Sequence, residues 1–134
     1  MMRDITTPPL AAVLALGLLA FGPAPTQAGQ LDGKVYLGEA GEKGKAANEK
    51  DEITFAAGQF HSRGCDPYGF GKGAYKATTK DGTTSFEATT TSVKEGKIQW
   101  TGTIKGDALD GRYVWTKAGQ APIEYWVKAT LKKK

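Results

Sequence analysis

Cysteine and histidine are almost absent from this chain of 134 residues, which contains one of each, Cys65 and His61. A single cysteine cannot form an intramolecular disulfide, so the stability of the fold has to come from a packed core. One histidine and one cysteine also fall short of the three or four ligands of a typical zinc site. We therefore expect neither a disulfide framework nor a metal site.

Other motifs that carry chemistry are missing as well. The chain has no glycine-rich phosphate loop followed by a helix and no serine in a nucleophile elbow. Its acidic residues fall mostly in turn segments or on polar strand faces, so we expect no pair of carboxylates facing one cleft, as glycoside hydrolysis requires. These absences favour a non-catalytic protein and predict no cofactor.

The charge of the chain is mildly basic, with a formal net charge of +4. Lysines are scattered along the sequence, and only residues 132–134 form a run. Nucleic-acid-binding proteins more often carry a basic stripe interleaved with aromatic side chains. The sequence therefore predicts no nucleic-acid partner.

Long apolar runs are also missing. The longest, residues 10–21, is too short to cross a bilayer comfortably, which takes about 20 residues. It follows Arg3 and is followed by prolines and small residues up to Ala28, an order typical of a secretory signal peptide. We predict a signal peptide over residues 1–28 and a single β-barrel domain over residues 29–134. The mature protein would be periplasmic or secreted, without stable membrane insertion.

Turn signals divide the remaining chain into short segments with a two-residue repeat. Asp81-Gly82, Glu95-Gly96 and Gly106-Asp107 separate runs rich in threonine, β-branched and aromatic residues. The pattern predicts an all-β fold, an antiparallel eight-stranded up-and-down meander barrel. The expected strands are residues 31–37, 52–56, 59–63, 73–79, 83–92, 97–105, 108–116 and 123–131. The mixed charge of residues 39–51 predicts a solvated loop that could act as a lid.

Apolar and polar faces alternate along successive strands, which predicts a sheet wrapped around one core. Two adjacent apolar faces are formed by Ile98, Trp100, Gly102 and Ile104, and by Leu109, Gly111, Tyr113 and Trp115. Glycine within a strand permits close approach, so we expect these aromatic rings to lie over Gly102 and Gly111. By the same alternation Trp126 points outward.

The predicted meander, with inward tryptophans on the hairpin 96–115 and Gly106-Asp107 in its turn, resembles the calycin-like barrels, the lipocalin and avidin type. The resemblance is one of fold and covers residues 31–131. It implies a small barrel whose mouth can hold one small ligand. Unrelated exported barrels share this architecture, including bacterial inhibitors of proteases and lysozymes, so fold does not decide function.

An irregular stretch, residues 60–75, gathers polar and aromatic side chains between glycines and is predicted to form the rim of a barrel mouth. The predicted ligand-binding residues are His61, Arg63, Tyr68, Phe70, Tyr75, Trp100, Tyr113 and Trp115. The alternative is that the rings simply fill the barrel and the stretch plugs one end. Cys65 would then be a buried, inert thiol.

Three functions are compatible with these residues. The leading hypothesis is an exported, monomeric, non-catalytic binding protein with a small molecule at the barrel mouth. The alternative is an inhibitor or interaction module whose exposed loops contact a protein partner. The third is a small enzyme using His61, Cys65 or Tyr68, which should bring His61 and a second titratable group together in a cleft.

Overall fold

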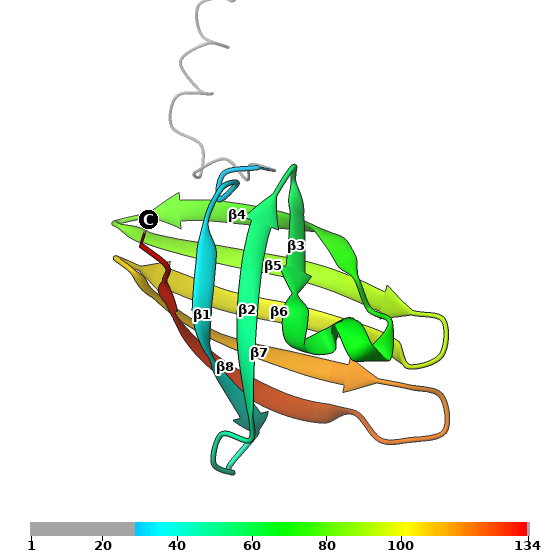
Figure 1. Cartoon of the computed structure of the whole chain (residues 1–134). Coiled ribbons are helices and arrows are strands. Elements are labelled where there is room, and N and C mark those ends of the chain that lie inside the picture. Colours follow the sequence, from blue (N-terminus) through cyan, green and yellow to red (C-terminus); the bar gives the residue numbers. More distant parts are fainter. Residues whose placement is uncertain (1–28, 134) are drawn as a thin grey trace, which may run out of the picture.

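The chain folds into one closed antiparallel β-barrel in which each strand pairs with its neighbours in sequence and the last strand pairs with the first (Figure 1). The structure is a computed structural model that describes residues 29–133, and the predicted signal peptide lies outside them. The predicted eight-stranded up-and-down barrel is confirmed. The strands are β1 (Val35–Glu42), β2 (Glu49–Ala56), β3 (Gln59–Ser62), β4 (Lys72–Lys80), β5 (Thr83–Ser92), β6 (Gly96–Lys105), β7 (Ala108–Thr116) and β8 (Ile123–Leu131).

Closure depends on the pairing of β1 with β8, which removes both edges of the sheet. In Figure 1, β1, β2 and β3 cross in front of β4 to β7, so the barrel is flattened into two crossing layers. The strands β5, β7 and β8 have the predicted bounds, and β6 begins one residue earlier than predicted. Within residues 29–133, no helix combines the length and hydropathy needed to cross a membrane.

Aromatic rings fill the barrel interior. The Phe55 ring packs edge-on against Tyr36, Phe60, Tyr75 and Phe86, with centroid separations of 4.9 to 6.1 Å. Edge-to-face contacts of this kind add to the stabilisation that burial of the rings provides. This half of the barrel is therefore a packed core rather than a cavity, as expected for an eight-stranded barrel.

The prediction of a solvated loop over residues 39–51 is wrong at both ends. β1 continues to Glu42 and β2 begins at Glu49, which leaves a connection of residues 43–48. Cross-strand pairing explains the extension, because Glu39 lies opposite Lys50 on β2 and opposite Lys128 on β8. Opposite charges on facing strands favour pairing. Charged residues such as Glu39 and Lys50, which suggested a loop, lie instead on the outer face of the β1–β2 hairpin. At the other end of β1, residues 31–34 form turns instead of the predicted strand.

The side chains that lie next to Gly102 and Gly111 on the inner wall differ from those predicted. A Cβ at Gly102 would lie 2.7 Å from the ring of Phe86, its cross-strand neighbour on β5. A Cβ at Gly111 would lie 3.1 Å from Val127. The rings over this wall therefore do not come from Trp100, Tyr113 or Trp115. On these two strands, Trp100, Tyr113 and Trp115 lie farther than Gly102 and Gly111 from the β6–β7 turn.

One buried polar group lacks a partner, and it makes a stability test. The Tyr36 side chain is 0% exposed, and among residues 29–133 its hydroxyl has no hydrogen bond. We expect Tyr36→Phe to raise the free energy of unfolding by about 1 kcal/mol, because an unsatisfied buried hydroxyl is removed. Urea unfolding measures this change.

Tyr75→Phe is the matched control for that substitution. The Tyr75 hydroxyl donates to Asp32 at 2.8 Å and accepts from the Leu31 amide at 2.7 Å. The same change should therefore lower the free energy of unfolding by about 1 to 2 kcal/mol. Equal effects at the two positions would contradict the assignment of Tyr36 as unsatisfied.

Candidate functional site

The two ends of the barrel differ. At one end, the turn residues 29–34 cover the core, with Leu31 buried and Asp32 bonded to the hydroxyl of Tyr75. At the other end, four connections surround an opening: residues 43–48, the short helix η2 (Arg63–Tyr68), and residues 93–95 and 117–122. Figure 1 shows η2 on the same side as the loops between β5 and β6 and between β7 and β8. We call this opening the mouth.

The mouth holds a pocket of about 290 Å³. Its walls combine aromatic, aliphatic and acidic side chains, with one thiol and one amide. The lining residues of this mouth pocket are Asn48, Glu49, Cys65, Tyr68, Phe70, Glu95, Ile98, Tyr113, Trp115 and Tyr125. A mostly apolar wall with a few convergent polar groups is the usual composition of a small-molecule site.

Stacked rings separate the pocket from the core. The ring of Tyr113 lies 4.1 Å from that of Trp100, centroid to centroid, and 4.8 Å from that of Tyr125, nearly parallel to it. Trp100 is 1% exposed, and its indole N–H donates to the hydroxyl of Thr90 at 3.2 Å. The pocket therefore has a rigid floor whose position is set by the core beneath it.

The rim is anchored by a buried carboxylate. Asp51, on the inner face of β2, accepts from the Ser62 hydroxyl at 2.6 Å, the Gly64 amide at 2.9 Å and the Glu52 amide at 2.8 Å. These bonds tie the first turn of η2 to the barrel wall, and η2 carries Tyr68 to the mouth. Burial raises the pKa of the Asp51 carboxyl, and the hydrogen bonds oppose this shift without cancelling it.

Two substitutions of Asp51 should distinguish the contribution of its hydrogen bonds to stability from that of its charge. Asp51→Ala leaves buried donors without an acceptor and should lower the free energy of unfolding by about 2 to 4 kcal/mol at pH 7. Asp51→Asn retains an oxygen for the two amides, and Ser62 can turn to accept from the new NH₂ group. We therefore expect the Asn variant to stay within about 1 kcal/mol of the wild type.

The pH dependence of the same variants tests the raised pKa. Since the folded state holds the Asp51 proton more tightly than the unfolded chain does, this group stabilises the fold at pH values below its ordinary pKa of 3.8. That contribution is lost as the pH rises through the raised folded-state pKa. The wild type should therefore lose stability relative to Asp51→Asn between acid and neutral pH. A constant difference in urea unfolding across that range would contradict the raised pKa.

Two carboxylates face this one pocket, contrary to the sequence prediction. Glu49 enters it because β2 starts earlier than expected, and Glu95 enters it from the turn between β5 and β6. Glu95 is held by Lys117 at 3.0 Å, and its backbone oxygen accepts from the indole of Trp115. Burial and the neighbouring Asp51 raise the pKa of Glu49.

Cys65 lines the pocket as a neutral thiol. It is 8% exposed, and burial is the main cause that raises its pKa to about 12. Its nearest polar partner is the Ser62 hydroxyl, 3.5 Å from the sulfur. Catalytic cysteines carry a lowered pKa instead. The thiol-enzyme hypothesis therefore gains no support from this environment.

Alkylation of Cys65 should be slow in the folded protein. With a pKa of about 12, the thiol holds roughly a thousandfold less thiolate at pH 8 than an ordinary cysteine does. We expect iodoacetamide to label the native chain at least about 100-fold more slowly than the chain in denaturant. Labelling at similar rates would show that the thiol is exposed or ionised.

The predicted binding residues divide into three groups. Tyr68, Phe70, Tyr113 and Trp115 come together in the mouth pocket, and Trp100 lies directly beneath them. Tyr75 lies at the opposite, covered end of the barrel.

His61 and Arg63 lie outside the mouth pocket. His61 lies 2.7 Å from Asp66, and Arg63 pairs with Glu52 at 3.1 Å. His61 thus has a titratable partner, but neither residue of that pair lines the pocket. Among residues 29–133, no three His, Cys, Asp or Glu side chains are grouped as metal ligands.

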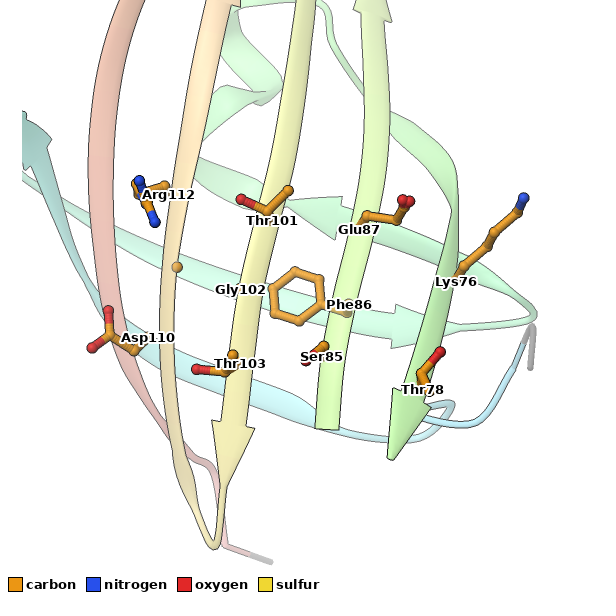
Figure 2. Close-up of a pocket in the computed structure, with 11 residues that line it drawn as sticks. Lys76, Thr78, Ser85, Phe86, Glu87, Thr101, Gly102, Thr103, Asp110 and Arg112 are labelled. Atoms are coloured by element: carbon orange, nitrogen blue, oxygen red, sulfur yellow. The ribbon is translucent and has the colours of Figure 1, made fainter. Parts of the chain in front are cut away.

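A larger concavity, about 840 Å³, lies on the outer wall of β4 to β7 (Figure 2). The outward side chains of Lys76, Glu87, Thr101 and Arg112 form one row across these strands, since their residues pair in register. Such a row of polar and charged side chains is the ordinary solvent face of a sheet. The mouth pocket is the better candidate site because aromatic side chains surround it.

Six pocket residues were not among the predicted ligand-binding residues: Asn48, Glu49, Cys65, Glu95, Ile98 and Tyr125. Glu49 could have been found by extending the inward alternation of Phe55, Ile53 and Asp51 by one further step along β2. Glu95 lies in a turn, where no periodicity indicates a direction.

Comparisons of the chain with protein-family models, with curated proteins and with solved structures found no match. The candidate site is therefore identified from the geometry of this chain alone.

Proposed function

We propose that this protein is an exported, non-catalytic binding protein that takes a small ligand into the mouth pocket. The observation that carries the proposal is a filled interior beneath an open end. Rings occupy the barrel up to Tyr113, and about 290 Å³ of space remains above them. That volume lies near the lower limit of ordinary ligand sites and suits a small molecule.

Two further observations support this function. The closed eight-stranded meander is the architecture of the calycin-like barrels, and we propose that the chain belongs with them. The charged, apolar and small-residue order of residues 1–28 supports export to the periplasm or the cell exterior.

Solvent extraction tests the proposal. Tryptophan fluorescence of the purified chain is recorded before and after extraction with organic solvent, and the extract is analysed by mass spectrometry. A co-purifying small molecule and a shift in emission are expected. Trp115→Phe should remove the shift because Trp115 lines the pocket, whereas Trp126→Phe, with its indole bonded to Lys45, should retain it. A clean extract with unchanged emission would contradict the proposal.

A second candidate, contact with a protein partner, is favoured by exposed apolar residues at the mouth. Tyr68 is 56% exposed and Val93 is fully exposed. The Ser92 hydroxyl donates to the Tyr68 carbonyl at 2.8 Å and holds the two connections together. Exposed apolar groups of this kind suit a protein contact. If the protein acts in this way, solvent extraction should yield no small molecule. A protein partner should bind the wild type and should no longer bind a Tyr68→Ala, Val93→Ser variant.

A further inference from the structure

The mouth pocket has a charge opposite to that of the chain. The protein carries a net charge of +4, yet the charged residues that line the pocket are Glu49 and Glu95. Lys117 offsets Glu95 in a 3.0 Å ion pair. Among residues 29–133, the Glu49 carboxylate has no ion pair or hydrogen bond of its own. One acidic group at the pocket is therefore left for a ligand.

The hydroxyl of Tyr113 is the second unpartnered group. Tyr113 is 5% exposed, and its side chain lines the pocket. The indoles of Trp100 and Trp115 both have hydrogen-bond acceptors, whereas the Tyr113 hydroxyl has no hydrogen-bond partner within residues 29–133. Within residues 29–133 the only wholly buried side-chain oxygen or nitrogen without a partner belongs to Tyr36, so the Tyr113 hydroxyl is open to the pocket and available to a ligand. A phenolic oxygen can accept a hydrogen bond from an N–H group.

The electrostatic environment disfavours an anion in the pocket. Burial raises the pKa of Tyr113 above its usual value, and the nearby acidic groups, including Glu49 and Asp51, raise it further. Burial, Glu42 and Glu49 raise the pKa of Tyr125 in the same direction. Negative charge in the ligand would meet the same repulsion that these hydroxyls meet on ionising.

The remaining walls suit an apolar body next to a cation. Tyr125 and Trp115 are half-buried rings at the pocket, and Ile98 and Phe70 are buried apolar neighbours. Aromatic faces attract ammonium groups, and the attraction is stronger where water is excluded. An amine on a small hydrocarbon body would therefore match the acidic, hydroxyl, aromatic and aliphatic groups of the pocket wall.

We propose that the mouth pocket selects a small protonated amine. This inference rests on the proposed binding function. The ammonium N–H groups donate to the Glu49 carboxylate and to the Tyr113 hydroxyl oxygen, and the hydrocarbon body packs against Trp115 and Tyr125. The ligand class is a primary ammonium on a compact apolar or aromatic body.

Three probes of similar size and different charge test the selection: 2-phenylethylammonium, the neutral 2-phenylethanol and the anion 3-phenylpropionate. Each is titrated into the full chain, with binding followed by calorimetry and by protection of Cys65 from iodoacetamide, since Cys65 lines the pocket. The amine should bind about tenfold more tightly than the alcohol, as expected for a hydrogen bond to a charged group. The anion should bind least.

Matched variants test which side chains cause the preference for the amine over the alcohol. Glu49→Gln should reduce the preference for amine over alcohol to about twofold while the alcohol still binds. Tyr113→Phe should weaken the amine more than the alcohol. Glu52→Gln is the control, because Glu52 is on the same strand but pairs with Arg63 outside the pocket. That control should leave the preference unchanged, and thermal unfolding of each variant confirms that the fold is retained.

The outcomes separate this inference from the proposed function. Equal binding of amine and alcohol, with Cys65 protected by both, would overturn the charge selection and leave the binding function intact. A preference that survives in Glu49→Gln and falls in Glu52→Gln would overturn the assigned site. No binding by any probe would overturn the selection, and an unprotected Cys65 would then also count against the pocket as a ligand site.

Discussion

Gly38→Ala should lower the free energy of unfolding by about 3 kcal/mol or more. A Cβ at Gly38 would lie 1.9 Å from the backbone oxygen of Lys128 and 2.5 Å from the Cα of Ala129. Both atoms belong to β8, so the clash falls on the pairing that closes the sheet. The backbone has to move apart there, because no side chain can turn away.

Gly106→Ala is the control for that substitution. Gly106 lies in the turn between β6 and β7 with φ 60°, and nothing lies within 4 Å of an added Cβ. The left-handed backbone alone should make this change unfavourable by about 1 to 2 kcal/mol. Urea unfolding measures both variants, and hydrogen exchange should show faster exchange in β1 and β8 for Gly38→Ala. Equal losses at the two glycines would contradict the role of Gly38 in closure.

Trp100→Ala should lower the free energy of unfolding by about 3 to 5 kcal/mol. The indole is 1% exposed and packs between the rings of Phe60 and Tyr113, at centroid distances of 4.6 and 4.1 Å. Its removal leaves a cavity and deprives the Thr90 hydroxyl of a donor. The cavity lies beneath the pocket floor, so the mouth pocket should also deepen.

Added indole should restore part of the stability of Trp100→Ala, because an apolar cavity of matching shape binds a small aromatic molecule. Trp126→Ala is the control, since the Trp126 indole lies outside the barrel and donates to the Lys45 carbonyl at 2.9 Å. Its loss should be about 1 kcal/mol and should not respond to indole. A Trp100→Ala variant as stable as Trp126→Ala would show that the floor is not part of the core.

Much of the fold could be predicted from periodicity. Along β6 the alternation assigned Ile98 and Trp100 to the interior, and both are buried. The two-residue repeat and the turn glycines also placed β5, β7 and β8 at their observed bounds. Local alternation suffices there because each strand has one buried and one solvated face.

The candidate site was only half predicted. Tyr113 and Trp115 were assigned correctly to the inner wall, and Tyr68 and Phe70 to the mouth segment. His61 was grouped with them because it is close in sequence, but on β3 it points away from the interior and meets Asp66. Neighbours along a strand face opposite sides, so proximity in sequence does not bring side chains into one site.

The sequence by itself determined the fold class, the order of the strands and the side chains that face inward, because each depends on residues close together along the chain. The tertiary structure decided how β1 closes on β8 and which end of the barrel remains open. It also brought Glu49 into the same pocket as Glu95 and Tyr113. Those contacts join residues far apart in sequence and depend on the register of the whole closed sheet, which local periodicity does not specify.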